Sequence, residues 1–307
     1  MNRMKYKRYF FYLFLLVIIL VFIIYFFNSK QKISFPEKNY SKEIILNMLA
    51  PGVYNNLSIT LTGDTIIHSQ EQLIINNSKI DLNNHSLIFR EGSKGEIRNS
   101  IILNASEEYW DGYVSRHPEE MENIMRNDNK WGVKPSAGLG VETNSFILDK
   151  SIVKNSYGHG IYLYYAKNPK ITNSFFINNS WCALRSEGST EIYFINNTLK
   201  ANAWQNPSKV GFAQIDINSG EDSVFSFNKV FSKTVTEGAV TFYNQKNLTI
   251  FNNEFDDVIL LDKCSNCVIK NNFAKELNLF GCEKITNENN KINKISESEK
   301  SGPEAWS

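Results

Sequence analysis

The sequence predicts an all-β solenoid that follows an N-terminal transmembrane helix. A phrase of the form aliphatic–x–Asn–Asn–x–aromatic recurs between about residues 144 and 290. Its second polar residue falls at positions 174, 197, 228, 253, 272 and 290, so successive copies are 23, 31, 25, 19 and 18 residues apart. A period of this size indicates stacked structural repeats. Within each copy, apolar and polar residues alternate over short segments rich in Ile, Phe, Val and Thr, which is strand patterning.

The N-terminal segment 9–27 contains 19 apolar or aromatic residues and no charge. This length is sufficient to cross a bilayer as a helix. Residues 1–8 contain four basic side chains and favour a cytoplasmic N-terminus. A cleaved signal peptide is the alternative, but Phe26-Phe27-Asn28 does not supply the small residues of a cleavage site. We expect an uncleaved anchor with the body of the protein outside the cytoplasm, in the periplasm or beyond the cell.

The remainder of the chain divides by its patterning. Residues 28–54 are predicted as a juxtamembrane stalk and residues 55–290 as the solenoid. Residues 105–137 interrupt the rhythm and are predicted as an insertion loop on one face, which is often where a repeat protein binds its ligand. The segment 291–307 is polar and is predicted as a C-terminal tail.

Two segments carry a resemblance to a known family. One is the phrase Ser78-Lys-Ile-Asp-Leu-Asn-Asn-His-Ser-Leu, and the other is Gly158-His-Gly-Ile-Tyr-Leu followed by Ile171-Thr-Asn-Ser-Phe-Phe. They resemble the right-handed parallel β-helix (pectate-lyase-like) superfamily and, within it, the domain of carbohydrate-binding proteins and sugar hydrolases. The resemblance implies a right-handed parallel β-helix and a polysaccharide as substrate or ligand. It leaves the activity open among lyase, hydrolase, epimerase and non-catalytic scaffold.

The asparagines of the repeat have a structural interpretation. Asn at a tight corner tolerates left-handed backbone angles and can hydrogen-bond its equivalents in the coils above and below. We therefore assign Asn173, Asn196, Asn252 and Asn271 to the solenoid corners rather than to a functional site.

Aligning the repeats also predicts which side chains share the outside of one sheet. Shifts of 22 to 31 residues superpose five short strands whose inward positions are almost all apolar. The first predicted outward column contains Tyr162, Arg185, Asp216 and Thr241. The second contains Glu142, Tyr164, Glu187, Asn218 and Tyr243.

These columns gather an arginine, three carboxylates and several tyrosines. Carboxylates at such separations can perform glycoside hydrolysis, and a basic group beside a uronate can move a proton. The candidate catalytic residues are therefore Arg185, Glu187, Asp216, Glu142 and the corner histidine His159. Tyr162, Tyr164 and Tyr243, with Trp110 and Trp131 of the insertion, are candidate sugar-stacking residues. The alternative is a solvated face with cross-strand ion pairs.

Charge and motifs limit the other function classes. The chain has 33 basic and 32 acidic residues, and without residues 1–27 the balance is 29 to 32. No basic stripe is present, so nucleic acid is not an expected partner. No phosphate-binding loop, nucleophile elbow or metal-binding helix motif occurs. The cofactor is undetermined, although Glu142, Glu187 and Asp216 could supply oxygens to calcium if they converge.

The chain contains four cysteines. Cys264 and Cys282 are 18 residues apart, which equals the local repeat, so they are predicted to stack on adjacent coils. Buried stacked thiols, a disulfide, and a metal or redox role that includes Cys267 all remain open. Cys182 is predicted to pack in the core.

Overall fold

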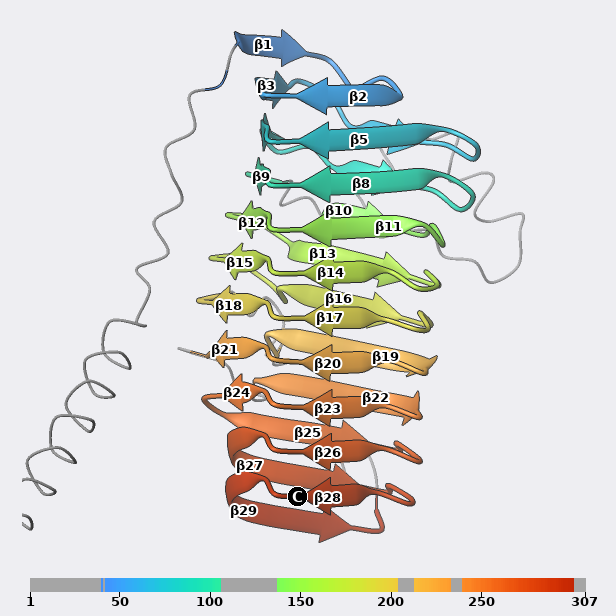
Figure 1. Cartoon of the computed structure of the whole chain (residues 1–307), viewed down its shortest axis with the longest axis vertical. Coiled ribbons are helices and arrows are strands. Elements are labelled where there is room, and N and C mark those ends of the chain that lie inside the picture. Colours follow the sequence, from blue (N-terminus) through green and yellow to red (C-terminus); the bar gives the residue numbers. More distant parts are fainter. Residues whose placement is uncertain (1–39, 41, 106–136, 204–212, 233–238, 301–307) are drawn as a thin grey trace, which may run out of the picture. The chain divides into compact units, whose positions relative to one another are not determined.

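The computed structural model describes residues 40, 42–105, 137–203, 213–232 and 239–300. In these residues the chain is a parallel β-solenoid whose coils stack in sequence order from β1 to β29 (Figure 1). The predicted anchor 9–27 and the indole residues Trp110 and Trp131 lie outside the described residues. Within the described part, no helix is long and apolar enough to cross a membrane.

Each complete coil contributes one strand to each of three faces. The face that carries the predicted columns is called face 1, and its strands are β4 (Thr65–Ile67), β7 (Leu87–Phe89), β10 (Ala137–Val141), β13 (His159–Tyr164), β16 (Leu184–Glu187), β19 (Ile215–Glu221), β22 (Val240–Lys246) and β25 (Val258–Asp262).

Face 2 is turned toward the viewer in Figure 1. Its strands are β2 (Gly52–Asn55), β5 (Gln72–Asn76), β8 (Lys94–Arg98), β11 (Phe146–Asp149), β14 (Lys170–Thr172), β17 (Tyr193–Ile195), β20 (Val224–Ser226), β23 (Thr249–Phe251), β26 (Val268–Lys270) and β28 (Thr286–Glu288).

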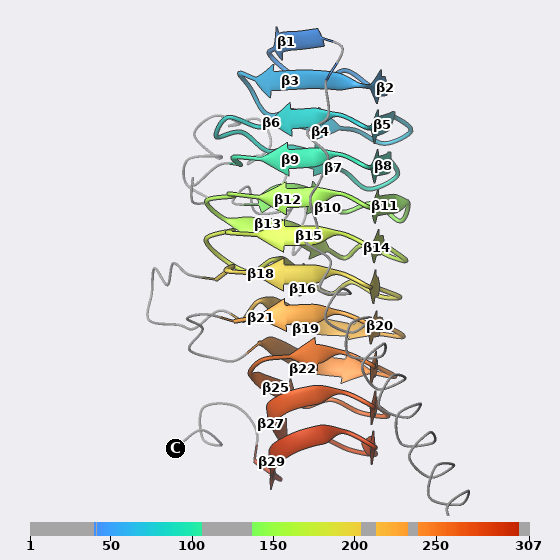
Figure 2. The same cartoon turned by 60° about the vertical axis from the view of Figure 1, so that its left-hand side comes forward.

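Face 3 comes forward in Figure 2. Its strands are β1 (Lys42–Leu46), β3 (Leu57–Leu61), β6 (Lys79–Asp81), β9 (Ile101–Leu103), β12 (Ile152–Lys154), β15 (Phe175–Ile177), β18 (Thr198–Lys200), β21 (Lys229–Phe231) and β24 (Glu254–Phe255). The two last long strands, β27 (Phe273–Phe280) and β29 (Lys291–Ser298), run through face 3 into face 1.

The solenoid extends beyond both predicted limits. β1 lies inside the predicted stalk and pairs in parallel with β3. β29 lies inside the predicted tail and pairs in parallel with β27. Most side chains of β29 are exposed, because no described strand pairs with its outer edge. A terminal strand of this kind loses the apolar alternation that identifies the others, so its sequence resembles a polar tail.

The core is a narrow stack of apolar side chains inside the coils. Phe176, Phe194 and Phe225 lie one above another with ring centroids 5.8 Å and 5.7 Å apart, and all three are fully buried. Offset aromatic pairs at such separations add to the stabilisation from burial. The inward positions of the sequence alignment, such as Leu163 and Ile217, are also fully buried, which confirms the inward half of the alignment.

The corner between faces 2 and 3 holds a ladder of buried amides. Each side chain accepts a hydrogen bond from the backbone N–H of its equivalent in the coil before it, and its own amide donates to a core-facing backbone carbonyl. The members are the buried Asn197, Asn228, Asn253 and Asn272 and, at the C-terminal end, the partly buried Asn290.

The ladder lies one residue after the positions that the sequence predicted for it. Asn173, Asn196, Asn252 and Asn271 have φ between 53° and 56°, so the predicted left-handed corner is confirmed. Asn196 also donates to Asn173 at 2.7 Å, but the continuous buried ladder belongs to the following asparagine of each pair. The two adjacent asparagines have different roles. The first adopts the left-handed backbone angles of the turn, and the second forms hydrogen bonds with buried backbone N–H and carbonyl groups.

We expect the buried ladder to dominate the stability of the coils. Asn228→Ala removes the acceptor of the Asn197 N–H, 2.9 Å away, and the donor to the Phe194 carbonyl, 2.8 Å away. Leaving two buried groups unsatisfied should cost about 2–4 kcal/mol. The exposed Glu254, paired with Lys229, is the control: Glu254→Ala should cost at most about 1 kcal/mol. Urea unfolding midpoints that shift equally in both variants would contradict this.

Candidate functional site

The strand register of face 1 brings the predicted residues into two columns. Tyr162 pairs with Arg185 and Arg185 with Asp216, while Tyr164 pairs with Glu187 and Glu187 with Asn218. The pairing of Val141 with Leu163 sets Glu142 beside Tyr164. The register predicted from sequence is therefore confirmed.

Arg185 is the centre of a compact ionic cluster. Its Nη2 donates to Glu187 Oε1 at 3.2 Å, and its Nη1 contacts Asp216 Oδ2. The Tyr162 hydroxyl forms a hydrogen bond with Glu187. The side chains of Arg185, Glu187 and Asp216 retain 20%, 28% and 15% of their exposure, so a ligand can reach the cluster from outside. We call these four residues the Arg185 cluster.

Tyr162 and Tyr164 are both buried, contrary to the expectation that they would stack on a sugar. Tyr162 is 1% exposed and Tyr164 is 7% exposed, although both belong to the outward columns. Their rings meet edge to face at 6.2 Å, and Tyr164 meets Tyr165 at 4.8 Å. Both tyrosines belong to β13, so outward side chains of the same strand pack on each other and an outward position does not guarantee exposure.

His159 is also packed rather than presented to solvent. It begins β13 and is 6% exposed, with Trp181 at 5.0 Å and Tyr162 at 5.7 Å between ring centroids. His159 is therefore packed against Trp181 and Tyr162 at the start of β13 and is not presented to the outer face as an acid or base would be.

Glu142 takes part in a different ion pair. Its Oε1 accepts from Arg90 Nη1 at 2.5 Å, so it is directed toward the preceding coil and not toward Arg185. Calcium needs several converging oxygens, whereas each of these carboxylates already contacts a guanidinium. No group of three or more His, Cys, Asp or Glu in the described ranges could hold a metal ion. The arrangement therefore does not fit calcium.

Tyr243 lies two coils beyond Glu187 and interacts with Lys263. The lysine ammonium donates to the tyrosine hydroxyl at 3.1 Å, and its nitrogen is 5.5 Å from the ring centroid. Tyr243 is partly exposed and lies outside the Arg185 cluster. It remains a candidate for contact with a long ligand that follows face 1.

Electrostatics distinguish the members of the cluster. Burial raises the pKa of Asp216 above its usual value and outweighs the opposing effect of Arg185. Burial alone would lower the pKa of Arg185, but Asp216 and its other neighbours raise it, so the guanidinium stays charged. Burial, and then the Glu187 carboxylate, raise the pKa of Tyr162.

A concave surface that the sequence did not predict runs along the corner of the asparagine ladder. This corner groove has a volume of about 730 Å³. Phe227 and Phe273 line it and are 49% and 50% exposed. Polar side chains complete it: Asn196, Asn252, Asn271, Asn289, Lys229, Glu254 and Lys291.

Phe227 is the residue from which the corner groove could have been predicted in the sequence. It stands where most other coils place the turn asparagine, with φ of 57°. A bulky residue in the left-handed region is an outlier that costs about 1–2 kcal/mol. Its ring packs edge to face on Phe251 at 5.2 Å but stays half exposed. The interruption is visible in the sequence, because FSFNKV departs from the double asparagine of FINNTL and IFNNEF.

Comparison with known proteins settles the family. Residues 59–214, just over half of the chain, match the family described as the right handed beta helix region. The chain belongs to this family. No curated protein matches the sequence.

Solved structures similar to this β-helix protein share little sequence with it. The Dettilon tailspike protein gp208 matches with a TM-score of 0.42 and 10% identity, over 83% of this chain and 61% of its own length. The Streptococcus pneumoniae surface protein and adhesin PfbA matches with a TM-score of 0.37 and 17% identity, over 85% and 82%. The periplasmic alginate epimerase AlgG matches with a TM-score of 0.39 and 11% identity, over 83% and 82%.

The raised pKa of Asp216 gives a prediction about pH. The folded β-helix holds this proton to higher pH than the unfolded chain. The stability that the group contributes is therefore fully present below its unfolded pKa and is lost as pH rises through its folded pKa. In carbon-13 NMR the Asp216 carboxyl should titrate above the ordinary value of about 3.9. Asp216→Asn should remove both that resonance and the associated loss of stability, and a titration at or below the ordinary value would contradict the assignment.

Proposed function

We propose that this protein binds a surface or matrix polysaccharide along face 1 and modifies it by acid–base chemistry at the Arg185 cluster. The observation that carries the proposal is the pair of carboxylates on one partly exposed guanidinium, with a pKa raised by burial in one of them. Carboxylates whose environments differ in this way are typical of acid–base sites.

Each member of the cluster has a chemical role in this proposal. Arg185 has five N–H donors, and those not used by Glu187 and Asp216 bind a sugar hydroxyl or a uronate carboxylate. Glu187 is the more exposed of the two carboxylates and acts as the base or nucleophile. Asp216 retains its proton to higher pH and acts as the acid. Tyr162 holds Glu187 in position through its hydroxyl.

The reaction class is a lyase, a hydrolase or an epimerase, because all three use a paired acid and base on a sugar ring. They differ in what the base removes. In a hydrolase it activates water or attacks the anomeric carbon, whereas in a lyase or an epimerase it abstracts a proton from the carbon next to a uronate carboxylate.

A second candidate is a non-catalytic glycan-binding module, and the corner groove favours it. Exposed aromatic rings stack on the apolar faces of sugars, and the exposed amides of Asn271 and Asn289 can bond to hydroxyls. The partners are then the same, but the binding surface is the corner groove and no bond is made or broken.

Two matched variants separate the candidates. Glu187→Gln keeps the size of the side chain and removes its charge, so turnover should fall by about 100-fold or more while affinity changes little. Phe227→Asn restores the residue type of the other coils and relieves the left-handed backbone, so it should fold normally and leave turnover unchanged.

The measurements are product analysis and binding of a panel of acidic and neutral polysaccharides to purified protein. Absence of turnover on every polysaccharide, together with affinity lost only in Phe227→Asn, would replace the enzymatic proposal by the binding module. Turnover that persists in Glu187→Gln would remove the cluster from the mechanism.

We also propose that residues 9–27 anchor the protein with its β-helix outside the cytoplasm. The support is the uncharged apolar run and the basic residues before it. A tag placed after Ser307 should be removed by protease added to intact cells, or to cells with a permeabilised outer envelope. A cytoplasmic control protein must stay intact in the same sample, and a protected tag would reverse the orientation.

A further inference from the structure

Three of the four cysteines gather in the last two corners between faces 1 and 2. Cys264 and Cys267 lie between β25 and β26, and Cys282 lies between β27 and β28. The bridge between Ser265 and Glu283, the residues that follow Cys264 and Cys282, fixes these two cysteines at equivalent positions of adjacent coils. The predicted stacking is therefore confirmed, and none of the four cysteines forms a disulfide in this structure.

The two stacked thiols point into the solenoid in the same way. Cys264 Sγ lies 3.4 Å from the carbonyl oxygens of Phe242 and Asp262, within hydrogen-bond distance of each. Cys282 Sγ lies 3.4 Å from the carbonyl oxygens of Leu261 and Phe280. Neighbouring strands are about 4.8 Å apart, within the Cα separation of about 4.4–6.8 Å that a disulfide requires. A bond between the two sulfurs therefore needs rotation of side chains and little backbone movement.

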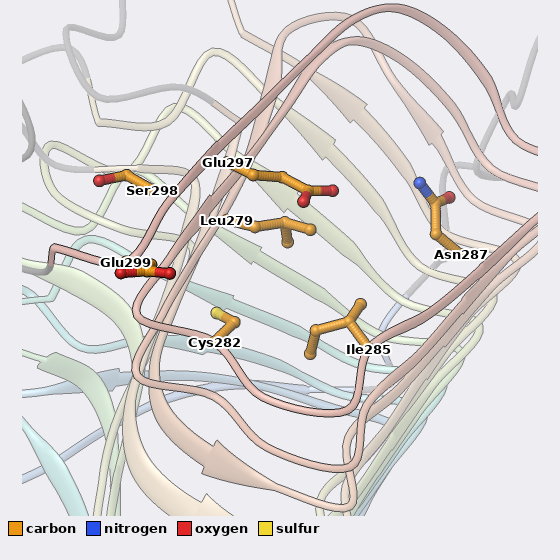
Figure 3. Close-up of a pocket in the computed structure, with 7 residues that line it drawn as sticks. All are labelled: Leu279, Cys282, Ile285, Asn287, Glu297, Ser298 and Glu299. Atoms are coloured by element: carbon orange, nitrogen blue, oxygen red, sulfur yellow. The ribbon is translucent and has the colours of Figure 1, made fainter.

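Only one of the three thiols can be reached from outside. Cys264 and Cys267 are each 1% exposed, whereas Cys282 is partly exposed. Cys282 lines a cavity of about 350 Å³ at the C-terminal end of the coils, where no described strand covers β28 and β29. Figure 3 shows Cys282 and Ile285 on one side of this cavity and Leu279 and Glu297 on the other.

We propose that Cys282 is a site of thiol–disulfide exchange whose product is a Cys264–Cys282 disulfide that joins the last two coils. The partner is a small disulfide, RSSR. The Cys282 thiolate attacks one sulfur, forms Cys282–S–S–R and releases one RS⁻. Cys264 then transfers its proton to the released RS⁻ and attacks the Cys282 sulfur, which releases the second RS⁻. Two protein thiols are oxidised by two electrons, and the small disulfide is reduced to two thiols.

The electrostatic environment supports Cys282 as the attacking group. The hydrogen bond from Cys264 lowers the pKa of Cys282 to about 7, and donation to Cys267 and Cys282 raises that of Cys264. A thiol with a pKa near ambient pH is the most effective nucleophile in exchange. Burial and the Asp262 carboxylate oppose this effect on the pKa of Cys282. Two further carboxylates, Glu297 and Glu299, line the cavity. They disfavour an anionic partner, so a neutral disulfide is the appropriate probe.

The test uses the full chain, reduced and then treated with 2-hydroxyethyl disulfide near pH 8. Trypsin separates peptide 264–270, which carries Cys264 and Cys267, from peptide 276–284, which carries Cys282. Mass spectrometry should detect these two peptides joined by a disulfide. The oxidised protein should also melt at a higher temperature than the reduced protein, because the cross-link closes a loop in the unfolded chain.

Three serine variants, each checked for an unchanged circular dichroism spectrum, identify the sulfurs. Cys264→Ser should accumulate the mixed disulfide at Cys282, and Cys282→Ser should prevent the cross-link. Cys267→Ser is the matched control, because this equally buried neighbour is not in the proposed bond, and it should leave the cross-link intact. In the native chain, Cys282 should react at least about tenfold faster than the buried Cys182.

Several results would overturn the proposal. They are a disulfide confined to peptide 264–270, loss of the cross-link in Cys267→Ser, and modification of Cys282 no faster than that of Cys182. Because the assay reports only on thiols, its outcome is independent of whether the protein acts on a polysaccharide.

Discussion

The whole structure depends on stacking each coil in register on the next, and the buried amide ladder enforces that register. Asn228 accepts from the backbone of Asn197 in one coil and donates to Asn253 in the next, and all three residues are buried. A shift by one residue would break every rung at once and turn apolar side chains outward. The chemistry of face 1 follows from this constraint: Arg185 meets Asp216 because Asn197 meets Asn228.

This dependence explains why the candidate site was partly visible in the sequence. Aligning the repeats on the asparagines gives the correct neighbours for Arg185 because the ladder itself sets the alignment. Alignment fixes backbone positions but not side-chain directions. It therefore missed that Glu142 turns to Arg90 and that Tyr162 is covered. The limits of the solenoid were missed for another reason, since terminal strands such as β29 have a partner on one side only.

The Arg185 cluster is not the arrangement that would make face 1 most stable. Partly buried ions lose hydration, and an apolar replacement of similar size is often as stable or more so. The same sheet uses such replacements nearby, since the column that holds Tyr162, Arg185 and Asp216 continues with Thr241 and Leu260. The concentration of charge within two coils is therefore a local feature, and face 1 does not need it elsewhere to form.

The near-constant spacing of the coils has a kinetic consequence. Most contacts between coils join residues 18 to 31 positions apart, so adding a coil closes a loop of similar length each time, with a similar loss of chain entropy. The exception is the step from Ser100 to Ser151, which spans 51 residues. If coils are added one after another, the loss of chain entropy is similar at every step except this one. Pairing the coil of Ser100 with the coil of Ser151 closes a longer loop and is therefore slower. That junction divides the solenoid into two blocks, each of which grows by short-range closure.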